Sequence, residues 1–206
     1  FRNPSGFPRK TSDIPRRIVR NLAQAQKIME KQESKFIPKL EIEKNVVNIG
    51  SKGEAETERM LSNFAHTPFD LDGVHYESVE AFWQSIKFPE GSKDRTETAG
   101  LVGGQAKRAG KRTRDIREIE YQSQTTKVGS SEHHKLMRRA IRAKLEQNPG
   151  VMKLLLDTGD KQITHVLKTP DGKILPDSKT IPGAVFSQIL MDLRQEFKQQ
   201  MEEEKD

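Results

Sequence analysis

Residues 78–88 read SVEAFWQSIKF, and their spacing predicts a helix. Ser78 is a favoured N-cap residue, and Pro89 and Gly91 provide a stop signal. Side chains at offsets of 0, +3, +4 and +7 share one face of a helix. The residues at these offsets are Glu80, Trp83, Gln84 and Lys87. Charged side chains are almost never fully buried unless they are paired, so this face predicts a pocket wall rather than ordinary core.

The flanking segments predict a compact α+β domain that is mainly helical and carries small β-hairpins. Apolar residues alternate between positions 69 and 76 around Asp72-Gly73, a strong short-range hairpin signal. A second hairpin is predicted across residues 163–175, with Pro170-Asp171-Gly172 at its tip. Further helices are predicted at 93–112 (one or two around Gly103-Gly104), at 131–147, at 149–157 and from about residue 182 onward.

We expect one domain with two appendages, since domains typically run about 100 to 200 residues. Residues 1–58 carry many prolines and charges and predict a basic N-terminal extension, irregular to residue 18 and then polar and helical over 19–35. Residues 59–200 are expected to form the folded domain, and residues 201–206 a polar tail.

Composition excludes several classes of protein. The chain has no cysteine, so it has no disulfide framework, thiol nucleophile or thiolate metal site. No apolar run approaches the roughly 20 residues needed to span a bilayer, and the first residues lack a signal-peptide pattern. We therefore expect a soluble cytoplasmic protein with no membrane partner.

The net charge of +6 is concentrated near the N-terminus. Residues 1–60 hold thirteen Lys/Arg and eight Asp/Glu, a balance of +5, whereas residues 61–206 hold twenty-three and twenty-two, a balance of +1. Two basic clusters in the second part are open to two interpretations, as phosphate contacts or as solvated helix faces. They are Lys107, Arg108, Lys111, Arg112 and Arg114, and Lys135, Arg138, Arg139, Arg142 and Lys144.

Several common catalytic motifs are absent. The five histidines form no HExxH pattern, and the adjacent His133 and His134 point to different sides of a helix, which argues against a shared metal. Gly103-Gly104 lacks the Gly-Lys-Ser/Thr ending of a Walker loop and the preceding strand of a dinucleotide fingerprint. No Gly-x-Ser-x-Gly elbow is present, so serine hydrolase chemistry is not indicated.

Over about residues 60–198 the chain resembles the NADAR (YbiA-like) family in the order and spacing of six motifs. They are Leu61-Ser62-Asn63-Phe64, Leu71-Asp72-Gly73, Ser78-x-Glu80-x-Phe82-Trp83-Gln84-x-x-Lys87-Phe88, Ala106-Lys107-x-x-Gly110-Lys111, Met137-x-x-Ala140-x-x-Ala143-Lys144 and Leu155-Leu156-x-Thr158-Gly159-Asp160. Many relatives later carry an aspartate before Trp-Gly and a glycine-rich Asn-x-Leu-Gly segment, where this chain reads Asp177-Ser178-Lys179-Thr180-Ile181-Pro182-Gly183.

The resemblance implies a compact, mainly helical fold with a small β component. It also implies cleavage of a bond between ribose C1 and nitrogen. The family is associated with ADP-ribose-like ligands, with removal of ADP-ribose from guanine in nucleic acid, and in some members with hydrolysis of phosphoribosyl intermediates of riboflavin synthesis. No metal or redox cofactor is expected.

Glu80 and Lys87 are the expected catalytic residues. Cleavage develops positive charge on the sugar, so Glu80 is suited to stabilise that charge or to move a proton. The resemblance favours Lys87 as an amine that traps the opened sugar as a Schiff base, and a cation facing phosphate is the alternative. A merely structural Glu/Lys pair within one helix is the remaining interpretation.

Nine further residues are expected to bind substrate. Trp83 is suited to stack on a base, or belongs to the core, and Asn63 is suited to bond ribose hydroxyls, or forms a turn. Lys107, Arg108 and Lys111 follow the glycine-rich break and are expected to face phosphates. The others are Phe64, Gln84, Asp160 and Asp177, of which the two aspartates bind ribose hydroxyls or cap turns.

Three functions remain open from the sequence. The first is a hydrolase that removes ADP-ribose from guanine, with ADP-ribosylated DNA as substrate and an ADP-ribosyltransferase as functional partner. The second is a glycosidase of small phosphoribosyl metabolites. The third is a non-catalytic module that binds ADP-ribose or nucleic acid. The acid and the amine on one helix face favour catalysis, and the basic N-terminal residues favour the first function.

Overall fold

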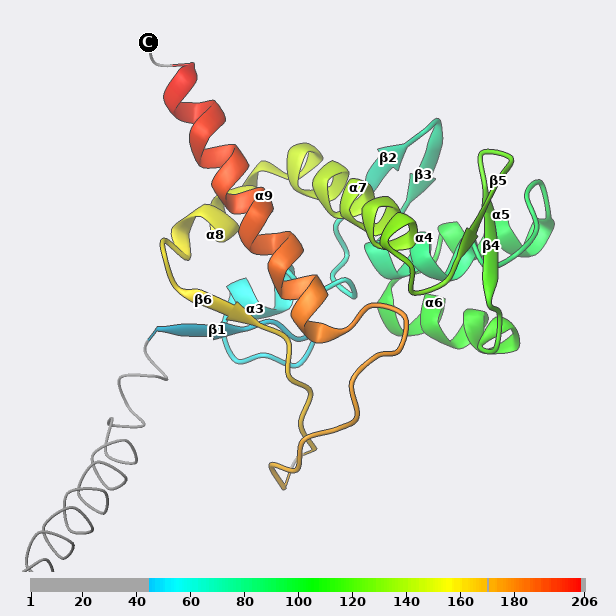
Figure 1. Cartoon of the computed structure of the whole chain (residues 1–206), viewed down its shortest axis with the longest axis horizontal. Coiled ribbons are helices and arrows are strands. Elements are labelled where there is room, and N and C mark those ends of the chain that lie inside the picture. The colour runs from blue at the N-terminus through cyan, green and yellow to red at the C-terminus, as the bar shows by residue number, and fades with distance from the viewer. Residues whose placement is uncertain (1–44, 170, 205–206) are drawn as a thin grey trace, which may run out of the picture. The chain divides into compact units, whose positions relative to one another are not determined.

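The computed structural model describes residues 45–169 and 171–204, and residues 46–206 form one compact unit (Figure 1). The described residues combine helices with three two-stranded sheets, which confirms the expected α+β class. The helix predicted at 19–35 lies outside the described residues. None of the helices in the described part is both long and apolar enough to cross a membrane.

The helices lie close to where their sequence patterns predict them. The region 93–112 contains two helices and continues into a 3-10 helix, η1. Ser130 caps the helix that begins at Ser131, because its hydroxyl accepts a hydrogen bond from the His133 amide. The bounds are α3 Glu56–Met60, α4 Val79–Ser85, α5 Lys93–Ala99, α6 Gly103–Ala109, η1 Gly110–Thr113, α7 Ser131–Gln147, α8 Pro149–Asp157 and α9 Gly183–Glu203.

The strands form one parallel pair and two hairpins. β1 (Val46–Asn48) runs parallel to β6 (Gln162–Thr164). β2 (Phe69–Leu71) and β3 (Val74–Tyr76) form the hairpin predicted around Asp72-Gly73 and lead into α4. β4 (Glu118–Tyr121) and β5 (Gln124–Lys127) form a second hairpin.

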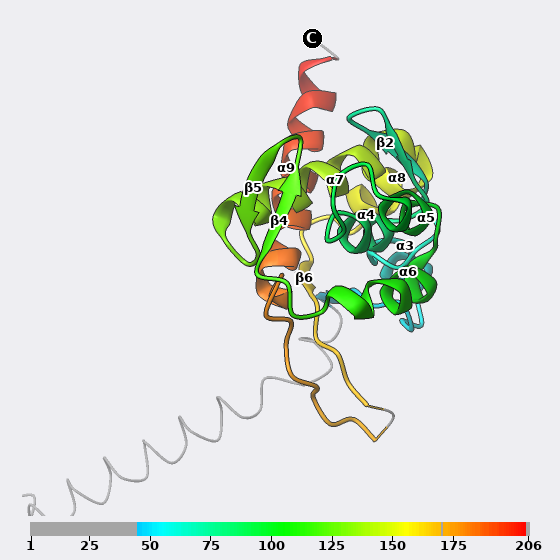
Figure 2. The same ribbon diagram turned by 90° about the vertical axis from the view of Figure 1, so that its right-hand side faces the viewer.

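The hairpin predicted across 163–175 is confirmed only in its outer part. There Lys168 and Ile174 form an isolated antiparallel bridge, and the Leu175 amide donates to the Leu167 carbonyl at 2.8 Å. The inner part is wrong, because β6 pairs with β1, with the fully buried Ile163 opposite Val47. The apolar pattern predicts a strand but not its partner, and β1 lies more than a hundred residues earlier. The connection from β6 to α9 projects away from the body in both views (Figures 1 and 2).

The hairpin of β4 and β5 carries no strong turn signal in the sequence. Its turn residues, Gln122 and Ser123, adopt φ values of 53° and 59°, a conformation that favours glycine or asparagine. The carboxylate of Glu90 accepts hydrogen bonds from both turn amides, at 2.5 Å and 3.2 Å. This distant carboxylate therefore stabilises a turn whose own residues disfavour it.

The folded unit begins at Val46 rather than at the expected residue 59. Ile49, directly after β1, is fully buried, and its amide donates to the Thr164 carbonyl at 2.8 Å. Residues 46–49 thus join the core through a partner that is distant in sequence. At the other end, α9 continues to Glu203, so the start of the expected polar tail is helical.

Helix α4 lies at the centre of the unit, and all seven of its residues are buried. α5, α6 and α7 pack around it. On its apolar side, the Phe82 ring meets the rings of Tyr76 and Tyr121 edge-on, at centroid distances of 5.1 Å and 5.6 Å. Burial of each such side chain contributes about 1.5–3 kcal/mol. This packing makes α4 a rigid support for the side chains on its polar face.

Candidate functional site

The polar face of α4 forms one wall of a pocket of about 390 Å³. Glu80, Trp83, Gln84 and Lys87 all line it, as their helical spacing predicts. Among the predicted binding residues, Asn63, Phe64 and Lys107 line it as well. The pocket therefore brings together the start of the domain, α4 and the first basic cluster.

A hydrogen-bonded chain joins the acid to the amine through Gln84. The Gln84 amide donates from Nε2 to Oε1 of Glu80 at 2.8 Å, and its Oε1 accepts from Nζ of Lys87. Glu80 and Lys87 are each 8% exposed, and Gln84 is 5% exposed. The two charged groups are thus bridged by an amide that complements each of them, in a site largely shielded from water.

Burial shifts the pKa of both groups toward their neutral forms. Desolvation raises the pKa of Glu80, against the opposing effects of the Gln84 hydrogen bond and of Lys107 and Lys87. Desolvation lowers the pKa of Lys87, partly offset by Glu80 and reinforced by Lys107. A protonated carboxyl and a neutral amine are the forms required of a proton donor and a nucleophile.

Trp83 is mainly a packing residue. Its ring lies 4.6 Å from the His133 ring, centroid to centroid, and Nζ of Lys87 lies 4.9 Å from the Trp83 centroid. The tryptophan therefore holds the lysine amine against the wall and presents little surface to the pocket. Phe64 is more open, with Nζ of Lys107 at 5.3 Å from its ring.

Two glycines of the glycine-rich break allow close packing against the site. A Cβ at Gly110 would lie 1.7 Å from Oε1 of Gln84, and one at Gly103 would lie 2.6 Å from the Phe64 carbonyl oxygen. Gly103 also has a φ of 42°, which disfavours other residues. These glycines therefore bring the backbone against Gln84 and Phe64 of the pocket lining.

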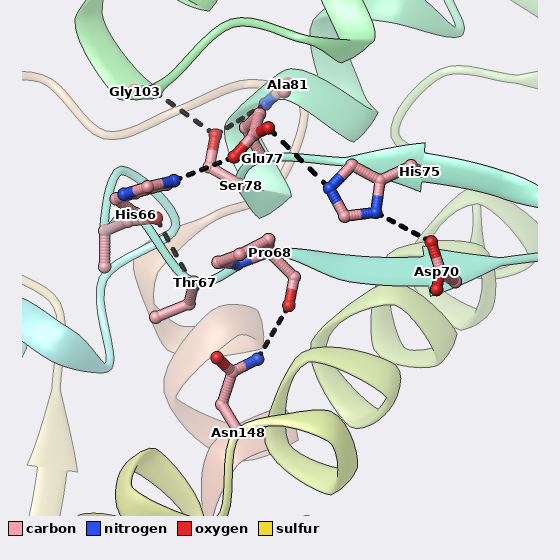
Figure 3. Close-up of polar contacts among 11 residues, drawn as sticks. His66, Thr67, Pro68, Asp70, His75, Glu77, Ser78, Ala81, Gly103 and Asn148 are labelled. Carbon is pink, nitrogen blue, oxygen red and sulfur yellow. Dashed lines mark hydrogen bonds and ion pairs between the residues drawn. The ribbon is translucent and has the colours of Figure 1, made fainter.

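Ser78 fixes the start of α4 against the start of α6 (Figure 3). Its hydroxyl oxygen accepts hydrogen bonds from the Ala81 amide at 3.1 Å and from the Gly103 amide at 3.2 Å. The Glu80 amide in turn donates to the Asn63 carbonyl at 2.9 Å. Glu80 therefore sits in the anchored first turn of α4, and Lys87 lies in the turn directly after the helix.

Figure 3 also shows two exposed histidines near this anchor, outside the pocket lining. His66 and His75 both contact the carboxylate of Glu77, at 2.7 Å and 3.6 Å. The part of the chain that the structure describes contains no group of three or more His, Cys, Asp or Glu residues placed to hold a metal ion.

Lys144 is a buried support and not a phosphate contact. It is 2% exposed, and its ammonium donates to the carbonyls of Met60 at 2.7 Å and Ser62 at 2.9 Å. Burial lowers its pKa to about 7. By holding these carbonyls, Lys144 positions the turn that carries Asn63.

Most other members of the two basic clusters face solvent or acidic partners. Arg138 and Arg142 both pair with Glu196, and Arg139 pairs with Asp72. Their charge is thus compensated within the fold, which favours the solvated-face interpretation for this helix.

Four of the predicted binding residues lie outside the pocket lining. Arg108 and Lys111 are exposed. Asp160 is also exposed and pairs with Lys198 at 3.1 Å. Asp177 accepts hydrogen bonds from the Gly183 amide at 2.9 Å through both carboxylate oxygens, so it caps α9. For both aspartates, the structure supports the alternative of a local structural role.

Asn63 retains unused hydrogen-bonding capacity. Its Oδ1 is buried and makes no hydrogen bond with any described residue, whereas its backbone carbonyl is engaged by Glu80. Buried polar atoms are usually paired, so this oxygen keeps an acceptor position that no described residue uses.

Sequence reasoning missed the wall opposite α4. His165 lines the pocket directly after β6, and Ser178, Thr180 and Ile181 of the connection to α9 lie there too. Arg114 also lines it, although the sequence singled it out only as a member of a basic cluster. The pairing of β6 with β1 places His165 at the site, and no local signal predicts that pairing.

Comparison with known proteins supports this architecture. A family model described as Bacteriophage protein GP30.3 matches residues 57–194. The chain is similar to the NMR structure of the E. coli protein YbiA, with a TM-score of 0.55 and 23% sequence identity, over 76% of this chain and 87% of that chain. This similarity confirms the expected YbiA-like fold. No curated protein sequence matches the chain.

Proposed function

The chain belongs to the Bacteriophage protein GP30.3 family, and from its YbiA-like fold and the chemistry of its pocket we propose that it is an N-glycosidase of the NADAR type. Its proposed substrate is guanine that carries ADP-ribose, in DNA or in a nucleotide. One observation carries the proposal: the buried chain from Glu80 through Gln84 to Lys87 at the pocket wall. A module that only binds ligand has no need for an acid and an amine whose pKa values burial shifts toward their neutral forms.

In the proposed reaction, the neutral amine of Lys87 attacks C1 of the ribose. The electron pair of the C1–N bond leaves with guanine, which takes a proton from the Glu80 carboxyl. The resulting Glu80 carboxylate accepts a proton from the attached nitrogen and passes it to the ring oxygen. The C1–oxygen bond then breaks, its electron pair stays on the oxygen, and a Schiff base forms between Lys87 and the opened sugar.

Gln84 has a positioning role in this scheme. Its amide holds Glu80 and Lys87 at opposite ends of one hydrogen-bonded chain within the pocket lining. The pocket volume of about 390 Å³ falls within the range typical of small-molecule sites, about 300–1,000 Å³. Lys107 and Arg114 supply cations for the diphosphate.

The charge distribution favours nucleic acid as the carrier of the modified base. Residues 1–60 hold five of the six net positive charges. Such a segment attracts a phosphate backbone without reading its sequence. We therefore propose ADP-ribosylated DNA as the substrate and an ADP-ribosyltransferase as the functional partner that makes the modification.

The test is release of free ADP-ribose from guanine-ADP-ribosylated DNA, with borohydride present in a parallel reaction. We expect release by the wild-type protein and a reduced adduct of the sugar on Lys87, located by peptide mass spectrometry. Lys87→Ala and Glu80→Gln should lower the rate by at least about a hundredfold. Lys153→Ala, at an exposed lysine of α8, is the matched control and should retain full activity.

Other outcomes identify the remaining functions. A pocket volume near the lower end of the usual range favours a smaller substrate as the second candidate. Turnover of phosphoribosyl metabolites without release from DNA would establish that candidate. Binding of ADP-ribose that persists in Lys87→Ala, without turnover of either substrate by wild type, would contradict the enzyme proposal altogether.

A further inference from the structure

His165 lines the pocket directly after β6 and is held in one orientation. Its Nδ1 lies 2.7 Å from the carbonyl oxygen of Ile49, and its ring meets the Phe186 ring at 5.2 Å and 80°. A Cβ at Gly183 would lie 2.3 Å from the His165 carbonyl oxygen, so the start of α9 packs directly on its backbone. The ring is thus fixed by β1, by α9 and by its own strand end.

The Ile49 contact also determines which ring nitrogen carries the proton. A carbonyl oxygen only accepts hydrogen bonds, so Nδ1 must be the donor. In a neutral imidazole the other nitrogen, Nε2, then holds a free lone pair. His165 lines the pocket, and Nε2 makes no hydrogen bond with any described residue. The structure therefore provides a fixed proton acceptor at the site.

Glu80 is the other ionisable group of the lining that could take up a proton, and the remaining ones are Lys87, Lys107 and Arg114. Lys107 and Arg114 are cations that donate, and Lys87 is occupied once it is bonded to the sugar. Glu80 ends the proposed scheme as a carboxylate that accepts a hydrogen bond from Gln84, whereas Nε2 of His165 has no partner among the described residues. Hydrolysis of the adduct needs a group that takes a proton from water.

We infer that His165 is a catalytic residue that accepts this proton, so that its Nε2 activates the water that releases the sugar from Lys87. This inference rests on the proposed function. The water oxygen bonds to C1, the electron pair of the carbon–nitrogen double bond moves to nitrogen, and one water proton passes to Nε2. The imidazolium then gives that proton to the nitrogen. The C1–nitrogen bond breaks with its pair on Lys87, and the hydroxyl proton passes to the freed Nε2 and from there to solvent as the aldehyde forms.

The test compares two substitutions, each of which places a side-chain amide where one of the two ring nitrogens of His165 lies. In His165→Asn, the side-chain amide can still donate to the Ile49 carbonyl, but no atom replaces Nε2. In His165→Gln, the amide reaches the position of Nε2 but loses the Ile49 contact. We expect His165→Asn to fold with a near-wild-type melting temperature, to release ADP-ribose at least about a hundredfold more slowly, and to accumulate more borohydride-trapped adduct than wild type.

A third variant separates chemistry from folding. His165→Ala leaves space next to the pocket, and added imidazole should restore part of its release rate without changing its melting temperature. Slow release combined with increased adduct and with rescue by imidazole would establish the role. Wild-type release by His165→Asn, or loss of adduct formation together with release in a folded variant, would overturn the inference.

The wild-type reactions distinguish failure of this inference from failure of the proposed function. Release by the wild type without any adduct on Lys87 would exclude a resolving role for His165 while leaving glycosidase activity in place. Failure of the wild type to release ADP-ribose would contradict the proposed function, and the role of His165 with it.

Discussion

A Cβ atom on Gly110 would lie 1.7 Å from Oε1 of Gln84, well inside the contact distance of two non-bonded atoms. Gly110 belongs to one of the six motifs that resemble the NADAR family, and its backbone packs against the amide that joins the acid to the amine. The absence of a side chain at residue 110 therefore leaves the space that the Gln84 amide occupies, and a substitution at this position tests the role of that amide.

Gly110→Ala should disable the site while leaving the fold intact. The new methyl group displaces the Gln84 amide, so Glu80 and Lys87 lose their bridge. We expect kcat/KM for ADP-ribose release to fall at least about tenfold. Gly104→Ala is the matched control, because its nearest neighbour, Nη1 of Arg108, would lie at an ordinary 3.6 Å. Equal activity of the two variants would contradict a bridging role for Gln84.

Glu80→Gln should stabilise the protein relative to the wild type, and this gain in the free energy of unfolding should grow as the pH rises. The folded pKa of Glu80 is raised above its ordinary value of 4.5, so above pH 4.5 the folded state retains a proton that the unfolded chain releases. Stability conferred by this group is therefore present at low pH and lost as pH rises through the folded pKa. The loss is about 1.4 kcal/mol for each pH unit that separates the folded pKa from the unfolded pKa. Urea unfolding at pH 4 and pH 8 checks this.

The advantage of the Glu80→Gln variant over the wild type should be larger at pH 8 than at pH 4. Glu77→Gln serves as a control, since Glu77 is more exposed and lies outside the pocket lining. A variant that is destabilised to the same extent at both pH values would show that the buried carboxyl carries no such penalty.

Asn63→Ala should weaken substrate binding without a loss of stability. Oδ1 of Asn63 is buried and has no hydrogen-bond partner among the described residues, so its removal breaks no contact within the protein. A single neutral hydrogen bond to substrate is worth about 0.5–1.5 kcal/mol. We therefore expect KM to rise up to about tenfold, with kcat and the melting temperature little changed. A lower melting temperature with unchanged KM would show that Asn63 stabilises the turn and does not bind substrate.

Lys144→Met should remove a pH dependence of stability above neutral pH. Lys144 has a folded pKa of about 7, against 10.5 as its ordinary value. Between these values the unfolded chain holds a proton that the folded chain lacks, so the wild type gains stability as pH rises, by at most about 1.4 kcal/mol per pH unit. Below pH 7 the penalty of burying the charge is fully present.

Urea unfolding at pH 7, 8 and 9 measures this gain directly. The wild-type slope should exceed that of Lys144→Met, whereas Lys135→Met, at an exposed lysine of the same helix, should keep the wild-type slope. Parallel slopes for the wild type and Lys144→Met would mean that Lys144 remains charged in the folded state.

The double substitution Gln122→Asn and Ser123→Gly should stabilise the hairpin of β4 and β5. Both positions have positive φ, which asparagine and glycine adopt readily, so we expect a gain of about 1 kcal/mol. Gly73→Ala in the other hairpin is the converse test, because φ is 80° and no atom lies within 4 Å of the added Cβ. It should destabilise through backbone conformation alone, as thermal unfolding of both variants would reveal.

Local signals were sufficient to predict the helices and one wall of the pocket. The cap at Ser78 and the spacing from Glu80 to Lys87 are properties of neighbouring residues, and a helix of 3.6 residues per turn converts that spacing into a shared face. The Asp72-Gly73 turn is predictable for the same reason, since its conformation depends on the residues within it.

Contacts between distant segments were not predictable in this way. Alternating apolar residues predict that β6 is a strand, but β1 became its partner through burial of Ile49 and Ile163. The burial of Lys144 was not predictable either. In sequence this lysine resembles its basic neighbours on the helix, and it differs from them only because the carbonyls of Met60 and Ser62 surround its ammonium group.

The sequence by itself determined the α+β class, the position of α4, and the acid and amide on its polar face with the amine just after its end, because these follow from periodicity and turn chemistry within a few residues. Tertiary structure alone decided that Gly110 packs against the Gln84 amide, that His165 lines the same pocket as Glu80 and Lys87, and that Lys144 is buried against the carbonyls of Met60 and Ser62. Those outcomes depend on which surfaces bury one another, and desolvation acts between residues that the chain separates by tens of positions.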